Sequence, residues 1–265
     1  MPPVRAGPVR PGSGVQGRTA LRKCRAGPTG RFSTDLDFAA AEEGLAGLVL
    51  STLDGHSCHG FTFTLAAVDA AAGRADLVVG APLTRRPPHP PGTIGIGSKV
   101  ELSSRRPWRA PDLLPLLPSG VHLALGHHVV QLLVMTVAES IAEKLARYAR
   151  VPLARDLYDL CWYGRGPLDE PAVRRMWLQK VYGDVVVDDR WKSKFQPAEI
   201  LFPRAASSID DESIGFLTQP EDIAAWERAF RARYTFLGNL DAEDQKWAAC
   251  NPRDRFTYDQ LTART

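Results

Sequence analysis

The sequence has few of the features that define several classes of protein. Its 265 residues include only four cysteines, and no two of them form a Cys-x-x-Cys pair. A disulfide framework or a structural zinc site is therefore not expected, and reduced thiols in a cytoplasmic protein fit better. The most apolar stretch, residues 121–138, is interrupted by three histidines and a glutamine. This composition favours a buried helix or strand over a membrane span, and no apolar run that would mark a signal peptide follows the first arginines.

Acidic side chains are missing from the first part of the chain. Residues 1–34 contain seven basic side chains and no acidic one, although the formal net charge of the whole chain is only +3. A basic segment attracts the phosphates of a nucleotide or of a nucleic acid. A solvated basic tail remains the simpler interpretation, because many charge runs have no specific partner.

The pattern of apolar residues changes along the chain and predicts an α+β protein. Residues 1–16, rich in proline, glycine and arginine, are expected to be a flexible lead-in. Alternation with a period of two predicts strands, and spacings of three and four predict helices. The predicted strands are 32–38, 60–68, 74–81 and 95–104, and the predicted helices are 19–25, 38–53, 139–150, 153–163, 170–182 and 220–234. With a proline-rich boundary at 107–118, this predicts a mixed sheet domain, 17–110, followed by a helical domain, 119–265.

Two aspartates in the first predicted strand form the leading candidate for a catalytic site. In a strand, Asp35 and Asp37 share one face, with their Cα atoms roughly 6 to 7 Å apart. Such a pair can bind Mg²⁺ together with nucleotide phosphates, and the ion would orient a hydroxyl for in-line displacement at an α-phosphorus. The alternative is an ordinary polar strand face. Aspartate is a poor strand former, however, and its presence among Phe32, Leu36 and Phe38 favours the functional interpretation.

Other residues of the first domain could complete this site. The segment Gly17-Arg18-Thr19 offers a glycine turn and a hydroxyl before a predicted helix, whose exposed N–H groups could bind phosphate. Ser33 shares the strand face of the aspartates. Glu101, in another predicted strand, is the candidate third carboxylate, although an exposed strand glutamate would look the same.

A second group of charges lies in the helical half. Asp156 and Asp159 share one face of a predicted helix, and Lys144 lies on the helix before it. The lysine could bind phosphates, or it could pair with the two acids in a structural salt-bridge cluster. The residues alone leave both possibilities open.

Four motifs follow one another in the order and spacing of a known family. They are Gly17–Lys23 with Gly30–Phe38, Val100-Glu101-Leu102, Ala142-Glu143-Lys144-Leu145-Ala146, and Ala154-Arg155-Asp156-Leu157-Tyr158-Asp159-Leu160. Together they resemble the motifs of the AbiEii/MenT-type nucleotidyltransferase toxins of type IV toxin–antitoxin systems. The resemblance implies a DNA-polymerase-β-like nucleotidyltransferase core, a helical C-terminal domain, Mg²⁺ and a nucleoside triphosphate donor. It also implies transfer of a nucleoside monophosphate to the 3′ acceptor end of tRNA, which blocks translation, and a cognate AbiEi-type antitoxin.

The same resemblance assigns roles to individual residues. It makes Asp35 and Asp37 the metal ligands and Glu101 the third catalytic carboxylate. The residues that it implies for nucleotide binding are Gly17, Arg18, Thr19, Ser33 and Lys144, and those that complete the pocket are Asp156 and Asp159.

One segment departs from the family pattern. Family members usually carry Lys-Gly-Gly-Thr or Lys-Gly-Gly-Ser at the phosphate turn, where this chain has Gln16-Gly17-Arg18-Thr19. The change removes a cationic side chain, and Arg18 adds a side chain where the backbone would approach the ligand. Arg18 therefore either replaces the lost charge or obstructs the turn. A catalytically degenerate module that binds nucleotide, RNA or antitoxin is therefore one alternative. A transferase acting on an acceptor other than RNA is a separate one.

Overall fold

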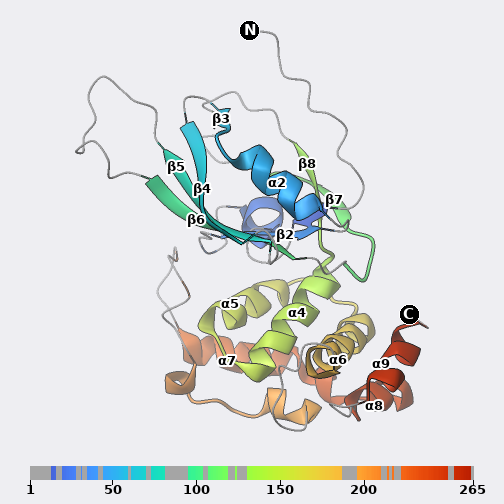
Figure 1. Cartoon of the computed structure of the whole chain (residues 1–265). Helices are drawn as coiled ribbons and strands as arrows, with labels where there is room; N and C mark the ends of the chain where they lie inside the picture. Colours follow the sequence, from blue (N-terminus) through green and yellow to red (C-terminus); the bar gives the residue numbers. More distant parts are fainter. Residues whose placement is uncertain are drawn as a thin grey trace. The chain divides into compact units, whose positions relative to one another are not determined.

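The computed structural model divides the chain into two compact units, Met1–Met135 and Thr136–Thr265 (Figure 1). The first unit contains a β-sheet and the second is helical. The predicted α+β class, a mixed sheet followed by helices, is confirmed. The residues that the structure describes are 13–15, 20–27, 31, 35–40, 44–58, 61–69, 73–80, 95–103, 107–118, 123, 130–186, 196–209, 214, 217, 222–249 and 254–263.

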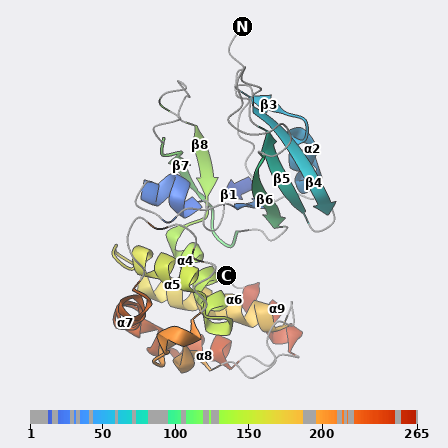
Figure 2. The ribbon, with the colours of Figure 1, turned by 90° about the vertical axis from the view of Figure 1, so that its left-hand side faces the viewer.

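The first unit is built on an eight-stranded sheet in the order β3-β4-β5-β6-β2-β1-β8-β7. The strands are β1 (Ser13–Val15), β2 (Leu36–Ala40), β3 (Ser57–Cys58), β4 (Phe61–Asp69), β5 (Arg74–Gly80), β6 (Gly95–Ser103), β7 (Asp112–Pro115) and β8 (Gln131–Val134). Pairing is parallel between β2 and β6 and between β1 and β8, and the other described pairs are antiparallel. Figure 2 shows β7 and β8 on the opposite side of β1 from β6.

The two faces of the sheet differ in polarity because residues alternate along each strand. Leu77, Val100 and Leu102 are buried in a cluster with Leu50 of helix α2 (Leu45–Leu53), which covers this face. On β5, the residues between the buried ones point the other way and are exposed. The alternation therefore gives the sheet one apolar face under α2 and one polar face.

Three predictions for this unit are wrong. The helix expected over 38–53 begins only at Leu45, because Phe38–Ala40 are strand residues held between β1 and β6. The expected lead-in 1–16 contains β1, whose three residues are too few to show a period. The proline-rich stretch 107–118 is not the boundary between the units, because β7 pairs there with β8 and both belong to the sheet unit.

The four helices predicted for the second unit are present in it. Its α-helices are α4 (Val137–Arg150), α5 (Ala154–Tyr163), α6 (Glu170–Val186), α7 (Ile223–Arg233), α8 (Ala242–Ala248) and α9 (Arg255–Thr262). The predicted helices are α4 to α7, whereas α8 and α9 were not predicted. Its 3₁₀ turns are η3 (Pro197–Leu201), η4 (Ala206–Ser208) and η5 (Thr235–Gly238), while the short π-helical segment η1 (Leu21–Ala26) belongs to the sheet unit. Side chains of Thr136, Asp222 and Asp241 cap the first turns of α4, α7 and α8. Every helix in the described part of the chain is too short or too polar to cross a lipid bilayer.

The turn before β5 depends on a glycine. Gly73 has a φ of +65°, and a Cβ atom at this position would lie 2.3 Å from the carbonyl oxygen of Leu102. We expect Gly73→Ala to lower the free energy of unfolding by at least about 2 kcal/mol, since it combines left-handed strain with a clash against backbone. Thermal unfolding measures the loss. Gly97→Ala is the matched control, because a Cβ there meets open space, and an equal effect of the two substitutions would contradict this account.

Candidate active site

Two of the predicted catalytic carboxylates lie at facing positions of the sheet. In the parallel pairing of β2 with β6, Asp37 is the register partner of Glu101. Register partners on neighbouring strands share a face, with their backbones about 4.8 Å apart. Asp37 is half-buried and Glu101 is exposed, on the face opposite α2. The tertiary fold thus brings together two acids that are separated by 63 intervening residues in the sequence.

Of the other residues predicted for the first-domain site, the structure describes only Asp35. Asp35 is half-buried and lies one residue before β2, because strand pairing starts at Leu36. Of the predicted nucleotide-binding residues, Gly17, Arg18, Thr19 and Ser33 lie outside the described residues. Among the residues that the structure does describe, no three histidine, cysteine or acidic side chains gather closely enough to form a metal site by themselves.

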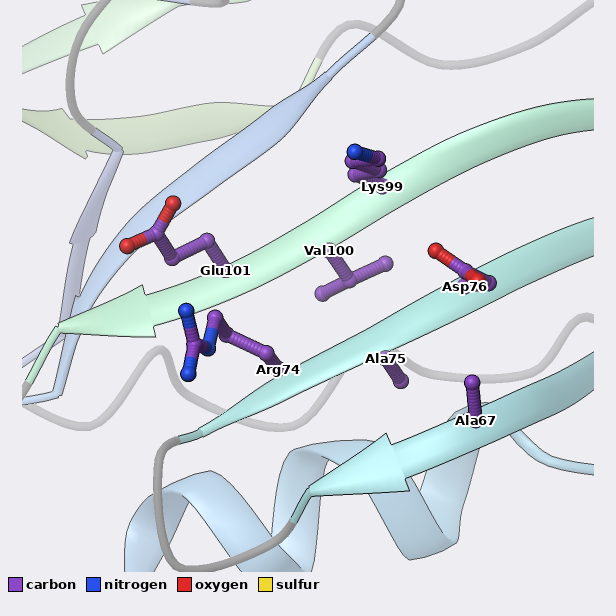
Figure 3. A pocket seen from close by; sticks show the side chains of 7 residues that line it. All are labelled: Ala67, Arg74, Ala75, Asp76, Lys99, Val100 and Glu101. Atoms are coloured by element: carbon purple, nitrogen blue, oxygen red, sulfur yellow. The ribbon is translucent and has the colours of Figure 1, made fainter.

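The sheet adds cationic residues that the sequence analysis did not single out. On the far side of β6 from β2, Arg74 of β5 is the register partner of Glu101, and Asp76 is the partner of Lys99. A pocket of about 160 Å³ lies here, and Figure 3 shows the side chains that line it: Ala67, Arg74, Ala75, Asp76, Lys99, Val100 and Glu101. The signal in the sequence was the alternation of charged and apolar residues from Arg74 to Leu77, which puts both charges on the polar face.

A β-bulge shapes the rim of this pocket. The pairing of β4 with β5 shifts register between Ala66 and Asp69, and Ala67 has a φ of +47°. After the shift, Asp69 faces Arg74, and their charged groups are 3.6 Å apart. A bulge bends its strand and redirects the neighbouring side chains, and bulges are common beside active sites.

The predicted charges of the helical unit form a buried cluster between α4 and α5. The ammonium of Lys144 donates to Asp159 at 2.6 Å and lies 3.9 Å from Asp156. Arg147, which the sequence analysis did not select, forms a bidentate ion pair with Asp156. Both carboxylates are fully buried, and Lys144 is almost so. The structural salt-bridge cluster that the sequence analysis gave as one possibility is therefore present. In it, two cations and two acids neutralise one another between two helices.

The electrostatics of the cluster favour the charged form of Arg147. Burial alone would lower the pKa of the Arg147 guanidinium, but the negative charge of Asp156 and its hydrogen bond outweigh burial, and the pKa is raised. A buried pair of this kind contributes little net stability when it is intact, yet the loss of one partner is costly, because the other charge stays buried.

Comparison with known proteins assigns the chain to a family. The profile of the family described as "Nucleotidyl transferase AbiEii toxin, Type IV TA system" matches residues 15–250, which include both the sheet carboxylates and the helical cluster. The chain belongs to this family. It is therefore a nucleotidyltransferase toxin of the AbiEii type, and the family resemblance stated from the motifs is confirmed.

The solved structure of one relative agrees with this assignment. The nucleotidyltransferase toxin MenT4 from Mycobacterium tuberculosis H37Rv is 38% identical to this chain, with a TM-score of 0.84 over 97% of this chain and 87% of that one. JHP933 from Helicobacter pylori is 17% identical, with a TM-score of 0.47 over 88% of this chain and 87% of that one. The second match is too distant to say anything about activity. The search of curated proteins gives no match to the sequence.

The helical cluster can be tested by removing one acid. Asp159→Asn leaves the Lys144 ammonium buried without its closest carboxylate, so we expect the free energy of unfolding to fall by about 3 kcal/mol. Asp259→Asn is the matched control, because it removes one partner of an exposed pair, Arg255 with Asp259, and should leave the melting temperature nearly unchanged. Equal melting temperatures for the two variants would show that burying Lys144 without its closest carboxylate has no cost in stability.

Proposed function

We propose that this nucleotidyltransferase moves a nucleoside monophosphate from a nucleoside triphosphate to the 3′ end of tRNA and thereby blocks translation. The observation that carries the proposal is the facing register of Asp37 and Glu101 on two parallel strands. Membership of the AbiEii family supports the transfer of a nucleotide. The choice of tRNA as acceptor comes from the family resemblance of the motifs.

The donor atoms of the site suit a hard divalent cation. Asp35, Asp37 and Glu101 offer only carboxylate oxygens, and Mg²⁺ prefers oxygen ligands and needs few of them from the protein when phosphates and water supply the rest. We propose Asp35 and Asp37 as the ligands of Mg²⁺. A bound Mg²⁺ supplies charge neutralisation at the transferring phosphate.

The chain's own residues provide the other parts of the reaction. Glu101 is the more exposed of the facing pair and is open to an incoming hydroxyl, whose proton its carboxylate accepts. The oxygen of that hydroxyl forms the new bond to the α-phosphorus, and the bond from this phosphorus to pyrophosphate breaks. Gly17, Arg18, Thr19 and Ser33 bind the triphosphate in this proposal.

We propose that Lys144 contacts the nucleotide phosphates and that Asp156 and Asp159 contribute to nucleotide binding with it. To contact a phosphate, the Lys144 ammonium exchanges the carboxylate of Asp159 for a phosphate oxygen. The bidentate pair of Arg147 with Asp156 holds the second acid while this exchange takes place.

The toxin–antitoxin family also implies a protein partner. We propose that this partner is a cognate AbiEi-type antitoxin, and that both proteins act in the cytoplasm, where tRNA is found.

The proposal is tested with labelled nucleoside triphosphates, Mg²⁺ and total tRNA. We expect label on tRNA, and a loss of at least about 100-fold with Asp37→Asn or Glu101→Gln, because each removes a charged oxygen that acts on the reacting groups. Asp259→Asn, on the surface of α9, is the control and should transfer at the wild-type rate. Periodate-treated tRNA, which lacks the terminal hydroxyl pair, should accept no label.

Each other outcome counts against a named part of the proposal. Triphosphate binding without transfer would point to a catalytically degenerate module, the effect expected if Arg18 obstructs the phosphate turn. Label on a protein or a small molecule, with tRNA unlabelled, would replace the acceptor. Label on periodate-treated tRNA would rule out the 3′ end as the site of addition.

A further inference from the structure

Four side chains form one transverse row on the polar face of the sheet. Asp37 on β2 faces Glu101 on β6, Glu101 faces Arg74 on β5, and Arg74 faces Asp69 on β4. Because neighbouring strands are about 4.8 Å apart, the backbone of Arg74 lies about 10 Å from that of Asp37, on the other side of Glu101. The facing carboxylates of Asp37 and Glu101 therefore have the cationic Arg74 as their neighbour on the β5 side.

On the opposite side of the row, Asp37 has strand β1 as its neighbour. Strand β1 pairs with β2 on the edge away from β6, and its last residue, Val15, faces Phe38, next to Asp37. The predicted phosphate turn, Gly17 to Thr19, begins two residues after Val15 in the sequence. The predicted phosphate turn thus begins, in the sequence, close to the residue of β1 that pairs next to Asp37.

In-line displacement fixes the direction from which the acceptor arrives. The attacking oxygen and the leaving pyrophosphate lie on opposite sides of the α-phosphorus. We infer from the closeness of the predicted phosphate turn to β1 in the sequence that pyrophosphate leaves on the β1 side, so that the acceptor hydroxyl approaches from the side of β6 and β5. This is the side on which Arg74 and Lys99 lie.

Arg74 is well placed to bind a phosphate there. Its side chain is 60% exposed, and its ion pair with Asp69 at 3.6 Å is an exposed contact that a phosphate can replace. The backbone beneath it is fixed, since Leu102 donates a hydrogen bond to the carbonyl of Gly73 at 2.7 Å. A guanidinium presents a planar fork of donors that matches a phosphate.

The pocket beside Arg74 has a size that suits a phosphate. Its volume of about 160 Å³ lies well below the roughly 300 to 1,000 Å³ of pockets that enclose whole small ligands. Figure 3 shows Arg74 and Glu101 reaching from neighbouring strands, with Lys99 farther along β6. The pocket therefore fits one phosphate group of a chain that continues along the surface.

We propose that Arg74, assisted by Lys99, binds a backbone phosphate of the acceptor RNA strand near its 3′ end. The inference rests on the proposed function and adds to it the path of the acceptor, which runs over β6 and β5 toward Glu101. Arg74 here is a substrate-binding residue that sets the position of the terminal hydroxyl.

The test compares Arg74→Ala, Arg74→Lys and wild type. Arg74→Ala should raise the KM for tRNA about tenfold, leave the KM for the triphosphate unchanged, and reduce the slope of log K against log salt by about 0.7, the value for one phosphate contact on a single strand. Arg74→Lys keeps the charge but loses the fork, so it should keep the slope and bind with intermediate affinity. Arg255→Ala, an exposed arginine on α9, is the control and should match wild type.

A second substitution should change the affinity for tRNA in the opposite direction. Asp69→Asn removes the acid that pairs with Arg74 and would repel a phosphate. We expect tighter binding of tRNA with an unchanged salt slope. Weaker binding by this variant would contradict the proposal, because the loss of an acid that competes for Arg74 should not weaken the contact of Arg74 with a phosphate.

Two results would overturn the inference: a raised KM for the triphosphate with unchanged tRNA binding, or no change in either. Tests of tRNA binding in the Asp37→Asn background need no transfer, so they separate this inference from the proposed function. A reduction of the salt slope by about 0.7 with Arg74→Ala in that background supports the RNA contact even if the transferred group goes elsewhere. Failure of the wild-type protein to bind tRNA refutes the RNA contact.

Discussion

The parallel pairing of β2 with β6 is the interaction on which the site depends. The backbone hydrogen bonds between these strands fix a register, and a shift by one residue would turn a carboxylate toward the opposite face of the sheet. The register is also fixed by burial, because Val100 and Leu102 must face Leu50 of α2. The same apolar contacts that stabilise the sheet thus put Asp37 and Glu101 side by side on its polar face.

The two units use charge in different ways. On the sheet, the charged side chains of Arg74, Asp76, Lys99 and Glu101 are exposed, so a polyanionic substrate can reach them without displacing buried partners. In the helical unit, Lys144 and Arg147 are already neutralised by the two aspartates of α5. That cluster joins two helices, and any role for Lys144 at a phosphate requires an exchange of partners.

Regular periodicity made most of the fold predictable. The strands expected at 60–68, 74–81 and 95–104 and the helices expected at 139–150 and 153–163 differ from the observed ones by a few residues at most. Short elements were missed because three or four residues cannot show a period, as in β1, or because prolines suggested a boundary, as around β7. Arg74 was missed because its importance comes from a neighbour 27 positions away in the sequence.

The sequence by itself determined the polarity of each strand face, the helical pattern of the second half and, through its motifs, the family. These are local properties, since they depend on residues within a few positions of one another. Only the tertiary structure decided that Asp37 faces Glu101, that Arg74 lies beyond them, and that Arg147 is the partner of Asp156. Strand register and helix packing join distant residues, and these contacts follow from the burial of a shared core that no single segment of the sequence specifies.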